Sequence, residues 1–239
     1  MPECCSISVI IPTFNEAENI ADVLRRVIAS LGPLGMQYEV LVVDDDSPDG
    51  TAEIAQKLLG AKGRVIRRVS GKKGLSLSVL EGIKQAALEA IVVMDGDGSH
   101  PPELIPSFVT NLKMGYDLVI ASRYVQGAGT KDFPLNRKVI SRVACVLGRA
   151  VTNIHDNTSG FFCIRKSALE GADITPRGFK IGLEVFVKTG IRKYKEIPYI
   201  FTNRQKGSSK LKGSTMRIYI WQLVDLLKFK LRHEHNKQC

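Results

Sequence analysis

The sequence predicts an α/β fold with a mainly parallel central sheet. Short apolar runs recur along the first 122 residues, and segments with the apolar spacing of helices separate them. Acidic residues follow directly after two of these runs. Strands that alternate with helices imply right-handed βαβ crossovers, which make neighbouring strands parallel. Because such sheets bind ligands at the carboxyl ends of their strands, we expect a nucleotide-binding type of architecture.

The expected elements of the first half follow one another closely. Strands are expected at residues 6–11, 39–43, 64–69, 91–94 and 117–121. Helices are expected at residues 17–31, 49–59, 75–88 and 102–114, and Asp49 is suited to cap the second of them. From residue 131 onward the rhythm changes, with a helix at 137–153, a strand at 160–165, a helix at 181–189 and a strand at 196–201. We expect this second half to wrap onto the first.

The C-terminal part divides into a loop and a helix. Glycine, serine and lysine dominate residues 205–213, which predicts a mobile basic loop. The apolar face expected for a helix at 214–231 consists of Met216, Ile220, Leu223, Leu227 and Leu231. The opposite face of this helix is expected to carry Arg217, Asp225, Lys228 and Arg232. We therefore expect one domain over residues 1–213 and an amphipathic helix with a tail over 214–239.

The net charge of +10 lies almost entirely near the C-terminus. Residues 192–239 hold twelve lysines and arginines against three acids, which leaves a net charge of +1 for residues 1–191. Such a region attracts anionic lipids, nucleic acids or small acidic molecules, and an ordinary solvated surface is the alternative. No run approaches the roughly 18 apolar residues that a membrane span needs. The last helix therefore either lies in a membrane interface or packs on the domain's own core.

Cysteine usage and the N-terminus predict a reducing, cytoplasmic setting. The five cysteines are odd in number and lack Cys-x-x-Cys spacing, which argues against a disulfide framework and against a zinc site. Asn15 and Glu16 interrupt the apolar run at 7–14 too early for a signal peptide.

Two acidic clusters follow the second and fourth expected strands. The first spans residues 44–47, and the second spans residues 95–100 with Asp95 and Asp97 in an Asp-x-Asp pattern. Carboxylates this close repel one another unless a cation or a donor-rich ligand neutralises them. Asp-x-Asp at a strand end suits Mg²⁺ or Mn²⁺, which takes one or two carboxylates and completes its shell with phosphates of the substrate. The alternative is that these aspartates close turns and cap helices.

Seven short motifs, in this order and spacing, carry a family resemblance. They are residues 10–16, 44–51, 95–97, 122–124, 159–162, 178–180 and 207–211, which read IIPTFNE, DDDSPDGT, DGD, SRY, SGFF, GFK and GSSKL. With them the chain resembles the inverting family 2 glycosyltransferases and, within that family, the polyprenyl (dolichyl) phosphate mannose synthases. The resemblance runs over residues 7–211. It implies a GT-A fold, GDP-mannose as donor, Mg²⁺ or Mn²⁺ as cofactor and a dolichyl-type phosphate as acceptor.

The resemblance also implies roles for individual residues. The nucleoside would be held by Pro12, Phe14, Glu16, Val43 and Asp45. The sugar and phosphates of the donor would meet Asp95, Gly96 and Asp97, and phosphate would also bind Arg123, Lys180, Arg204 and Lys210. The residues carrying the catalysis would be Asp95, Asp97 and Arg204. Asp97 would ligate the metal, and Ser99 stands where some members carry a glutamine ligand. Gly96 replaces a common alanine.

The expected chemistry agrees with this resemblance. The leaving diphosphate gains charge on its β-phosphate, which a cation at Asp97 and the guanidinium of Arg204 would stabilise. An acceptor phosphate with a second pKa of about 6 is already largely dianionic at neutral pH, so no strong general base is required. Asp95 is therefore expected to orient the donor. A single displacement would invert the α-linkage to β.

Other functions are compatible with the residues alone. A UDP-glucose-dependent enzyme acting on the same lipid, or a nucleotidyltransferase, would need similar acids. A non-catalytic nucleic-acid module would use the basic C-terminal region and stack Trp221 or Tyr219 on bases. Because the acidic clusters would repel nucleic-acid phosphates, we expect no nucleic-acid partner. We expect peripheral association with the cytoplasmic face of a membrane, directly or through a membrane-anchored subunit.

Overall fold

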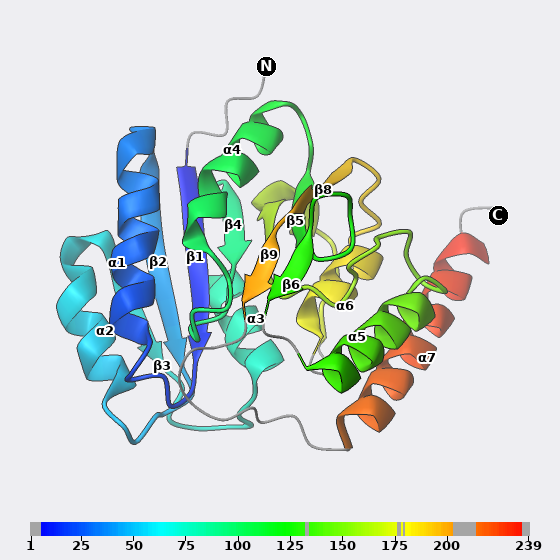
Figure 1. The fold of residues 1–239 in the computed structure, drawn as a ribbon, viewed down its shortest axis with the longest axis horizontal. Helices are drawn as coiled ribbons and strands as arrows, with labels where there is room; N and C mark the ends of the chain where they lie inside the picture. Colours follow the sequence, from blue (N-terminus) through cyan, green and yellow to red (C-terminus); the bar gives the residue numbers. More distant parts are fainter. Residues whose placement is uncertain (1–5, 132–133, 176–177, 179, 203–213, 236–239) are drawn as a thin grey trace.

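A seven-stranded sheet forms the centre of the computed structural model, which describes residues 6–131, 134–175, 178, 180–202 and 214–235 (Figure 1). The strand order is β3-β2-β1-β4-β7-β5-β8. The strands are β1 (Ser6–Thr13), β2 (Gln37–Asp44), β3 (Gly63–Arg67), β4 (Ala90–Val93), β5 (Leu118–Ser122), β7 (Phe162–Arg165) and β8 (Tyr194–Pro198). All pairs are parallel except those that β7 makes with β4 and β5. The predicted mainly parallel α/β fold is confirmed.

Helices cover both faces of the sheet. One face packs against α1 (Ile20–Leu31), α2 (Thr51–Leu59) and α4 (Ile105–Lys113), and the other against α3 (Leu75–Gln85) and α6 (Ile181–Lys188). Successive side chains of a strand point to opposite faces. Accordingly, Val9 and Ile11 join the first core and Ile10 joins the second. Because both faces are buried, the strands carry continuous apolar runs, which is why the sequence revealed them.

Short 3₁₀ turns adjust several of the expected boundaries. They are η1 (Gly32–Leu34), η2 (Gly60–Lys62), η3 (Pro102–Leu104) and η4 (Lys166–Leu169). The helix expected at 102–114 divides into η3 and α4, with Pro106 in the first turn of α4, where its missing N–H costs nothing. The first helix starts at Ile20 rather than at residue 17, because Asn19 and Ile20 first make a turn on the carbonyl of Glu16.

The strand expected at 196–201 is wrong as a single element. β8 ends at Pro198, and the N–H of the next residue, Tyr199, donates to the main-chain oxygen of Ser122 at 3.2 Å at the end of this ladder. The buried Tyr199 separates it from β9 (Ile200–Thr202), and β9 pairs with β6 (Gly129–Lys131) in a second, two-stranded sheet. This small sheet, which was not predicted, extends the fold beyond the end of β5.

Two helices complete the second half. The helix expected at 137–153 is α5 (Leu135–Gly148), and the last helix is α7 (Ser214–His235) (Figure 1). Tyr219 of α7 donates a hydrogen bond to the main-chain oxygen of Ala144 at 2.8 Å, which joins α7 to α5. The last residue of α5, Gly148, packs directly on Asn157, since a Cβ there would lie 2.3 Å from the side-chain oxygen of Asn157.

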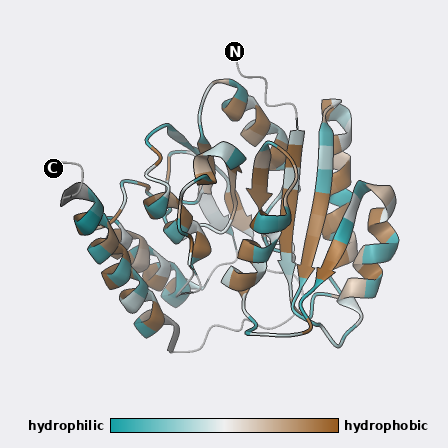
Figure 2. Ribbon diagram, turned by 180° about the vertical axis from the view of Figure 1, so that it is seen from behind, coloured by the Kyte–Doolittle hydropathy of each residue, from teal (hydrophilic) through white to brown (hydrophobic). Residues whose placement is uncertain are grey.

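The apolar face expected for α7 packs on the domain only in part. The residues of α7 that are buried are Tyr219, Gln222 and Leu226, with Met216 and Leu223 of the expected face partly buried beside them. Ile220, Leu227 and Leu231 of the same expected face are exposed. Apolar residues occur around most of the circumference of this helix, as the alternating colours along it in Figure 2 show. Periodicity alone could therefore not identify the side that packs.

Candidate active site

The carboxyl ends of β1, β2, β4 and β5 lie along one edge of the sheet. β1 has β2 on one side and β4 on the other, so the order of the chain reverses around β1. Open α/β sheets bind ligands at such a reversal. The residues that end or follow these strands are Pro12, Phe14, Glu16, Val43, Asp45, Asp95, Gly96, Asp97 and Arg123. The fold therefore collects most of the expected site residues along a single edge.

Asp44 of the first acidic cluster and Asp49, which follows the cluster, maintain the local structure. Asp44 is fully buried and accepts hydrogen bonds from the hydroxyl of Thr13 at 2.9 Å and from the hydroxyl and N–H of Ser47 at 2.7 and 2.8 Å. Asp49 accepts from the N–H groups of Thr51 and Ala17, both at 3.1 Å. Burial opposes ionisation of Asp49, but the hydrogen bond from the hydroxyl of Thr51 at 2.6 Å and those from the two N–H groups outweigh it and lower its pKa. For these two residues the turn alternative is correct, whereas the N-cap of α2 is Gly50 and not Asp49 as expected.

The segment after β1 turns sharply toward α2. Asn15 has a left-handed backbone with φ 57°, and its N–H donates to the hydroxyl of Ser47 at 2.9 Å. The N–H of Glu16 donates to the hydroxyl of Thr51, also at 2.9 Å. Phe14, at the tip of this turn, is 39% exposed. An exposed aromatic ring at a ligand edge offers a surface on which a flat base can stack.

Pro12 and Val43 are enclosed by the fold. Pro12 is buried within β1, and the side chain of Val43 belongs to the core between the sheet and α3. Val43 can therefore meet a ligand only through its main chain.

Asp45 is held by residues that the sequence analysis did not identify. Its buried carboxylate accepts from the guanidinium of Arg68, from the hydroxyl of Ser78 at 2.8 Å and from the N–H of Gly74 at 2.6 Å. A carboxylate offers about four lone-pair sites, so one remains for a ligand. Arg68 also donates to the main-chain oxygen of Lys72 at 2.7 Å, which fixes residues 71–74 beside Asp45. The feature of the sequence that could have identified Arg68 is its position directly after β3.

The Asp-x-Asp segment follows β4. Gly96 sits against the end of β1, since a Cβ there would approach Cγ2 of Thr13 to 3.0 Å. Asp97 is 8% exposed and accepts from the N–H of Ser99 at 3.0 Å. The side chain of Asp95 is 34% exposed, and its main-chain N–H donates to Nδ1 of His100 at 3.0 Å.

The oxygen ligands of this segment fit a hard divalent cation. Within the described residues, no group of three or more His, Cys, Asp or Glu side chains could hold a metal ion. Mg²⁺ is commonly bound by one or two carboxylates and by phosphates of its substrate, and such a site needs no larger protein cluster. Asp97, with the buried Ser99 beside it, supplies donors of this kind.

Arg123 is the centre of a buried ion pair. Its Nε and Nη2 donate to the two carboxylate oxygens of Asp156, each at 2.7 Å, and Nη2 also donates to Thr158 at 2.9 Å. The side chain of Arg123 is only 9% exposed, and that of Asp156 is fully buried. Burial disfavours both charges, yet each ion stabilises the other, so the pKa of Arg123 is raised and that of Asp156 is lowered.

Lys180 adjoins the same cluster. Its Nζ donates to the main-chain oxygen of Thr158 at 3.1 Å. Burial lowers the pKa of Lys180 and the nearby Arg123 lowers it further, while Asp95 and Asp156 act in the opposite direction. Arg123 and Lys180 thus form a buried basic cluster in which water screens charge poorly, and the charge of Asp95 acts on Lys180.

Some residues of the candidate site were not identified from the sequence. Two of the residues that were identified lie outside the part of the chain that the structure describes. Asp156 and Thr158 directly precede the motif at 159–162, which was the available signal for them. Arg204 and Lys210 fall in 203–213, which the structure does not describe.

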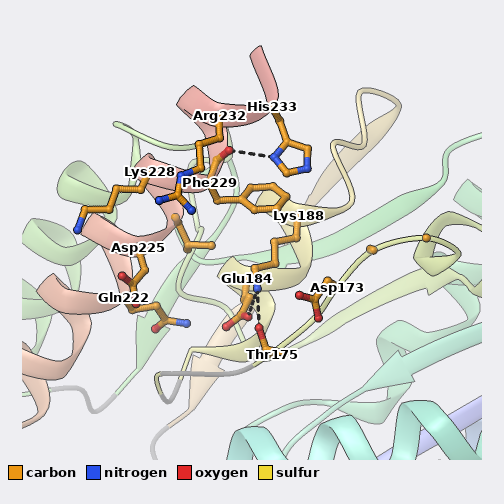
Figure 3. A pocket seen from close by; sticks show the side chains of 13 residues that line it. Asp173, Thr175, Glu184, Lys188, Gln222, Asp225, Lys228, Phe229, Arg232 and His233 are labelled. Carbon is orange, nitrogen blue, oxygen red and sulfur yellow. Dashed lines mark hydrogen bonds and ion pairs between the residues drawn. The ribbon is translucent and has the colours of Figure 1, made fainter. Parts of the chain in front are cut away.

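A separate cavity of about 620 Å³ lies between α6, α7 and residues 171–175 (Figure 3). Glu184 and Lys188 form an ion pair of 2.8 Å in its wall, and Lys188 also donates to Thr175 at 3.1 Å. None of the expected site residues lines this cavity.

Comparison with known proteins identifies the family. The model of "Glycosyl transferase family 2" matches residues 8–171. The chain belongs to this family. Among its relatives are three proteins named dolichol-phosphate mannosyltransferase. Those of Pyrococcus furiosus, Mycosarcoma maydis and Saccharomyces cerevisiae are 44, 38 and 37% identical to the chain. The matches cover 94, 94 and 93% of the chain and 64, 80 and 87% of these relatives, so the chain spans just under two thirds of the Pyrococcus protein.

Solved structures agree with this family 2 fold. Mannosyl-3-phosphoglycerate synthase from Rubrobacter xylanophilus superimposes with a TM-score of 0.70 at 17% identity, over 97% of this chain and 75% of that one. Glucosyl-3-phosphoglycerate synthase from Mycobacterium tuberculosis, solved with Mn²⁺, UDP-glucose and phosphoglyceric acid, gives a TM-score of 0.67 at 21% identity, over 93 and 80% of the two chains. At these identities the likeness establishes the fold alone, and the expected GT-A type is confirmed.

Proposed function

We propose that this chain transfers mannose from GDP-mannose to a dolichyl (polyprenyl) phosphate, with inversion at the sugar carbon. The observation that carries the proposal is the similarity of nearly the whole chain to three dolichol-phosphate mannosyltransferases. The arrangement of the carboxyl edge supports it, because Asp-x-Asp lies at the reversal of strand order with a cationic cluster beside it.

The donor occupies the edge from β2 to β5 in this proposal. Its nucleoside contacts Phe14, Glu16 and the Asp45 corner, and its diphosphate extends toward Asp97. A Mg²⁺ or Mn²⁺ ion held by Asp97, with Ser99 beside it, would neutralise charge on the diphosphate as the sugar leaves. A manganese ion in a structure of the same fold supports this assignment.

The remaining residues orient the reactants. Asp95 holds the sugar, with its partly exposed carboxylate directed to the edge. Asp156 already binds two nitrogens of Arg123, so this guanidinium acts on the phosphate chiefly through its fixed positive charge. Lys180 acts in the same way. Arg204 and Lys210 add phosphate-binding charge. The acceptor phosphate attacks the sugar carbon directly, since it is already ionised near neutral pH.

The acceptor lipid is reached at a membrane surface through α5 and α7. The helix α5 carries the exposed apolar residues Leu135, Val139, Ile140, Val143, Val146 and Leu147. The exposed apolar residues of α7 are Ile218, Ile220, Trp221, Val224, Leu227 and Leu231. Basic residues accompany both sets, and α5 contains no acidic residue. Exposed apolar side chains flanked by lysine and arginine fit an anionic bilayer interface.

The helix α7 also contacts the proposed site. Nε2 of Gln222 donates to the main-chain oxygen of Lys180 at 3.0 Å. In the described part of the chain, no helix is long and apolar enough to cross a membrane. We therefore propose peripheral attachment to the cytoplasmic face by residues 214–239 and α5, with a membrane-anchored subunit as the alternative attachment.

The test is incubation of the purified chain with radiolabelled nucleotide sugars and short polyprenyl phosphates, with Mg²⁺, with Mn²⁺ and with a chelator. Label from GDP-mannose should move to the lipid fraction, and the product should be the β-anomer. Transfer from UDP-glucose instead would assign the alternative donor. No transfer from any nucleotide sugar, in a preparation that binds GDP, would overturn the proposal.

A further inference from the structure

His100 is a buried neighbour of Asp95, and its contacts suggest a role beyond packing. Its Nδ1 accepts the main-chain N–H of Asp95 at 3.0 Å. Its Nε2 lies 3.8 Å from the Oδ2 atom of the Asp95 carboxylate. The imidazole therefore faces both the backbone and the side chain of the same residue, and it is only 4% exposed.

The hydrogen bond to Asp95 defines the tautomer of the ring. A neutral imidazole has one nitrogen that donates and one that accepts. Because Nδ1 accepts from the N–H of Asp95, the ring proton is on Nε2. The two nitrogens of an imidazole point in widely divergent directions, and the 3.8 Å from Nε2 to the Asp95 carboxylate is beyond hydrogen-bond distance, so the contact through Nδ1 is the one that orients Asp95.

Aromatic side chains fix the plane of this ring. His100 stacks on Phe161 with ring centroids 5.0 Å apart and an angle of 9° between the planes. Tyr199 and Phe201 present their edges to it at 6.3 and 6.4 Å. A Cβ on Gly160 would lie 3.5 Å from Cε1 of His100 and 3.7 Å from Oδ1 of Asp95, so this glycine flanks both groups. The ring has a defined orientation that a cavity-filling residue would not need.

We infer that His100 is a positioning residue for Asp95. It holds the backbone of Asp95 through Nδ1, which fixes the position from which the carboxylate reaches the donor sugar. The inference rests on the proposed function, because it concerns how Asp95 is presented in sugar transfer. A histidine that merely fills the core would require only the stack on Phe161, and the two interpretations differ in what a ring without nitrogens should do.

The test replaces the ring nitrogens while keeping the stack. His100→Phe should bind GDP with the affinity of the wild type, yet its kcat should fall about 10- to 100-fold, the cost typical of losing a residue that orients a ligand-binding group. His100→Asn offers an acceptor near the place of Nδ1 and should recover most of the lost kcat. A wild-type kcat in a folded His100→Phe would overturn the inference. Absence of sugar transfer by the wild-type chain would instead overturn the proposed function.

A second pair of variants applies where His100→Phe does not fold. His100→Gln places its amide near Nε2 and leaves the Asp95 N–H without its acceptor, whereas His100→Asn retains that acceptor. We expect the kcat of His100→Gln to be about tenfold below that of His100→Asn, with similar KM values for the nucleotide sugar. Equal kcat values for these two variants would overturn the inference. His233→Phe is the control, since this exposed histidine stacks on Phe229 of its own helix, and a soluble short-chain acceptor removes any membrane effect.

Discussion

Arg123 and Asp156 form a two-pronged ion pair across 33 residues of sequence, with both nitrogen–oxygen distances at 2.7 Å. The pair joins the end of β5 to the segment that precedes β7. The N–H groups of His155 and Asp156 in turn donate to Glu196 on β8 at 2.9 and 3.0 Å. The cationic side of the proposed site is therefore built on three strands, and its geometry depends on the fully buried carboxylate of Asp156.

Replacing Asp156 by asparagine should strongly destabilise the fold. The change leaves the guanidinium of Arg123 buried without a counter-charge, which costs about 3–5 kcal/mol. Chemical unfolding of the variant and the wild type at pH 7 measures this loss of unfolding free energy. Asp117→Asn is the matched control, because its carboxylate lies 3.7 Å from Arg165 and is 39% exposed, so its loss should cost under about 1 kcal/mol. Equal destabilisation by the two variants would contradict the assigned role of the buried pair.

The same variant makes a prediction about pH. The pKa of Asp156 is lower in the folded chain than its unfolded value of about 3.9. Its contribution to stability is therefore fully present above about pH 4 and disappears as the pH falls through the lower, folded pKa. The difference in unfolding free energy between the wild type and Asp156→Asn should be constant from pH 7 to about pH 5 and should narrow only below about pH 4. If this difference in unfolding free energy narrowed near neutral pH, a group other than Asp156 would be taking up the proton that weakens the pair.

Removal of the Asp97 carboxylate should abolish transfer and leave the fold intact. Asp97→Asn keeps the size of the side chain and an oxygen that can accept from the N–H of Ser99, which lies at 3.0 Å, but it reduces the affinity for a hard cation. A chelator should silence the wild type, and added Mg²⁺ or Mn²⁺ should restore it. Thermal unfolding is the control for folding. Transfer that survives both the chelator and the substitution would exclude a metal at Asp97.

A methyl group at Gly182 should destabilise the chain. A Cβ there would lie 2.7 Å from the main-chain oxygen of Ser159, which cannot rotate away, so Gly182→Ala should cost about 1–3 kcal/mol. Gly32→Ala is the control, since a Cβ there has no neighbour within 4 Å and the backbone is already helical. This control should be neutral or slightly stabilising. Urea unfolding of both variants checks the contrast.

The α/β fold and the site residues that follow strands could be predicted from the sequence. The contacts that hold these residues in place could not. Buried parallel strands such as β1 produce continuous apolar runs, and Asp95 and Asp97 follow one of them directly. The bond between Arg123 and Asp156 depends on how β7 enters the sheet antiparallel, and no local pattern encodes that direction. The role of Asp44 was equally hidden, because a carboxylate that closes a turn and one that binds a ligand have the same sequence context.

Membrane attachment should depend on α5 and α7 together. Trp221 is 67% exposed and Ile140 is 53% exposed, and neither position is required for the buried contacts of Tyr219 and Leu226. Replacing both exposed residues by serine should therefore lower binding to anionic liposomes without altering thermal unfolding. Met114→Ser is the matched control, because Met114 is 71% exposed but follows α4. Binding by this control should equal that of the wild type.

The contributions of charge and of apolar contact to membrane binding can be separated in the same liposome assay. Each basic side chain near an anionic surface contributes about 1 kcal/mol, a term that weakens with salt. Reversing Lys228 and Arg232 to glutamate should thus weaken co-sedimentation most at low ionic strength, whereas the double serine variant should bind poorly at every salt concentration. Both variants should lose activity on long-chain acceptors in vesicles and retain it on a soluble short-chain acceptor, because only the former requires the enzyme to meet the bilayer. Wild-type protein that stays in the supernatant with all vesicles, yet is active in native membranes, would assign attachment to a membrane-anchored subunit instead.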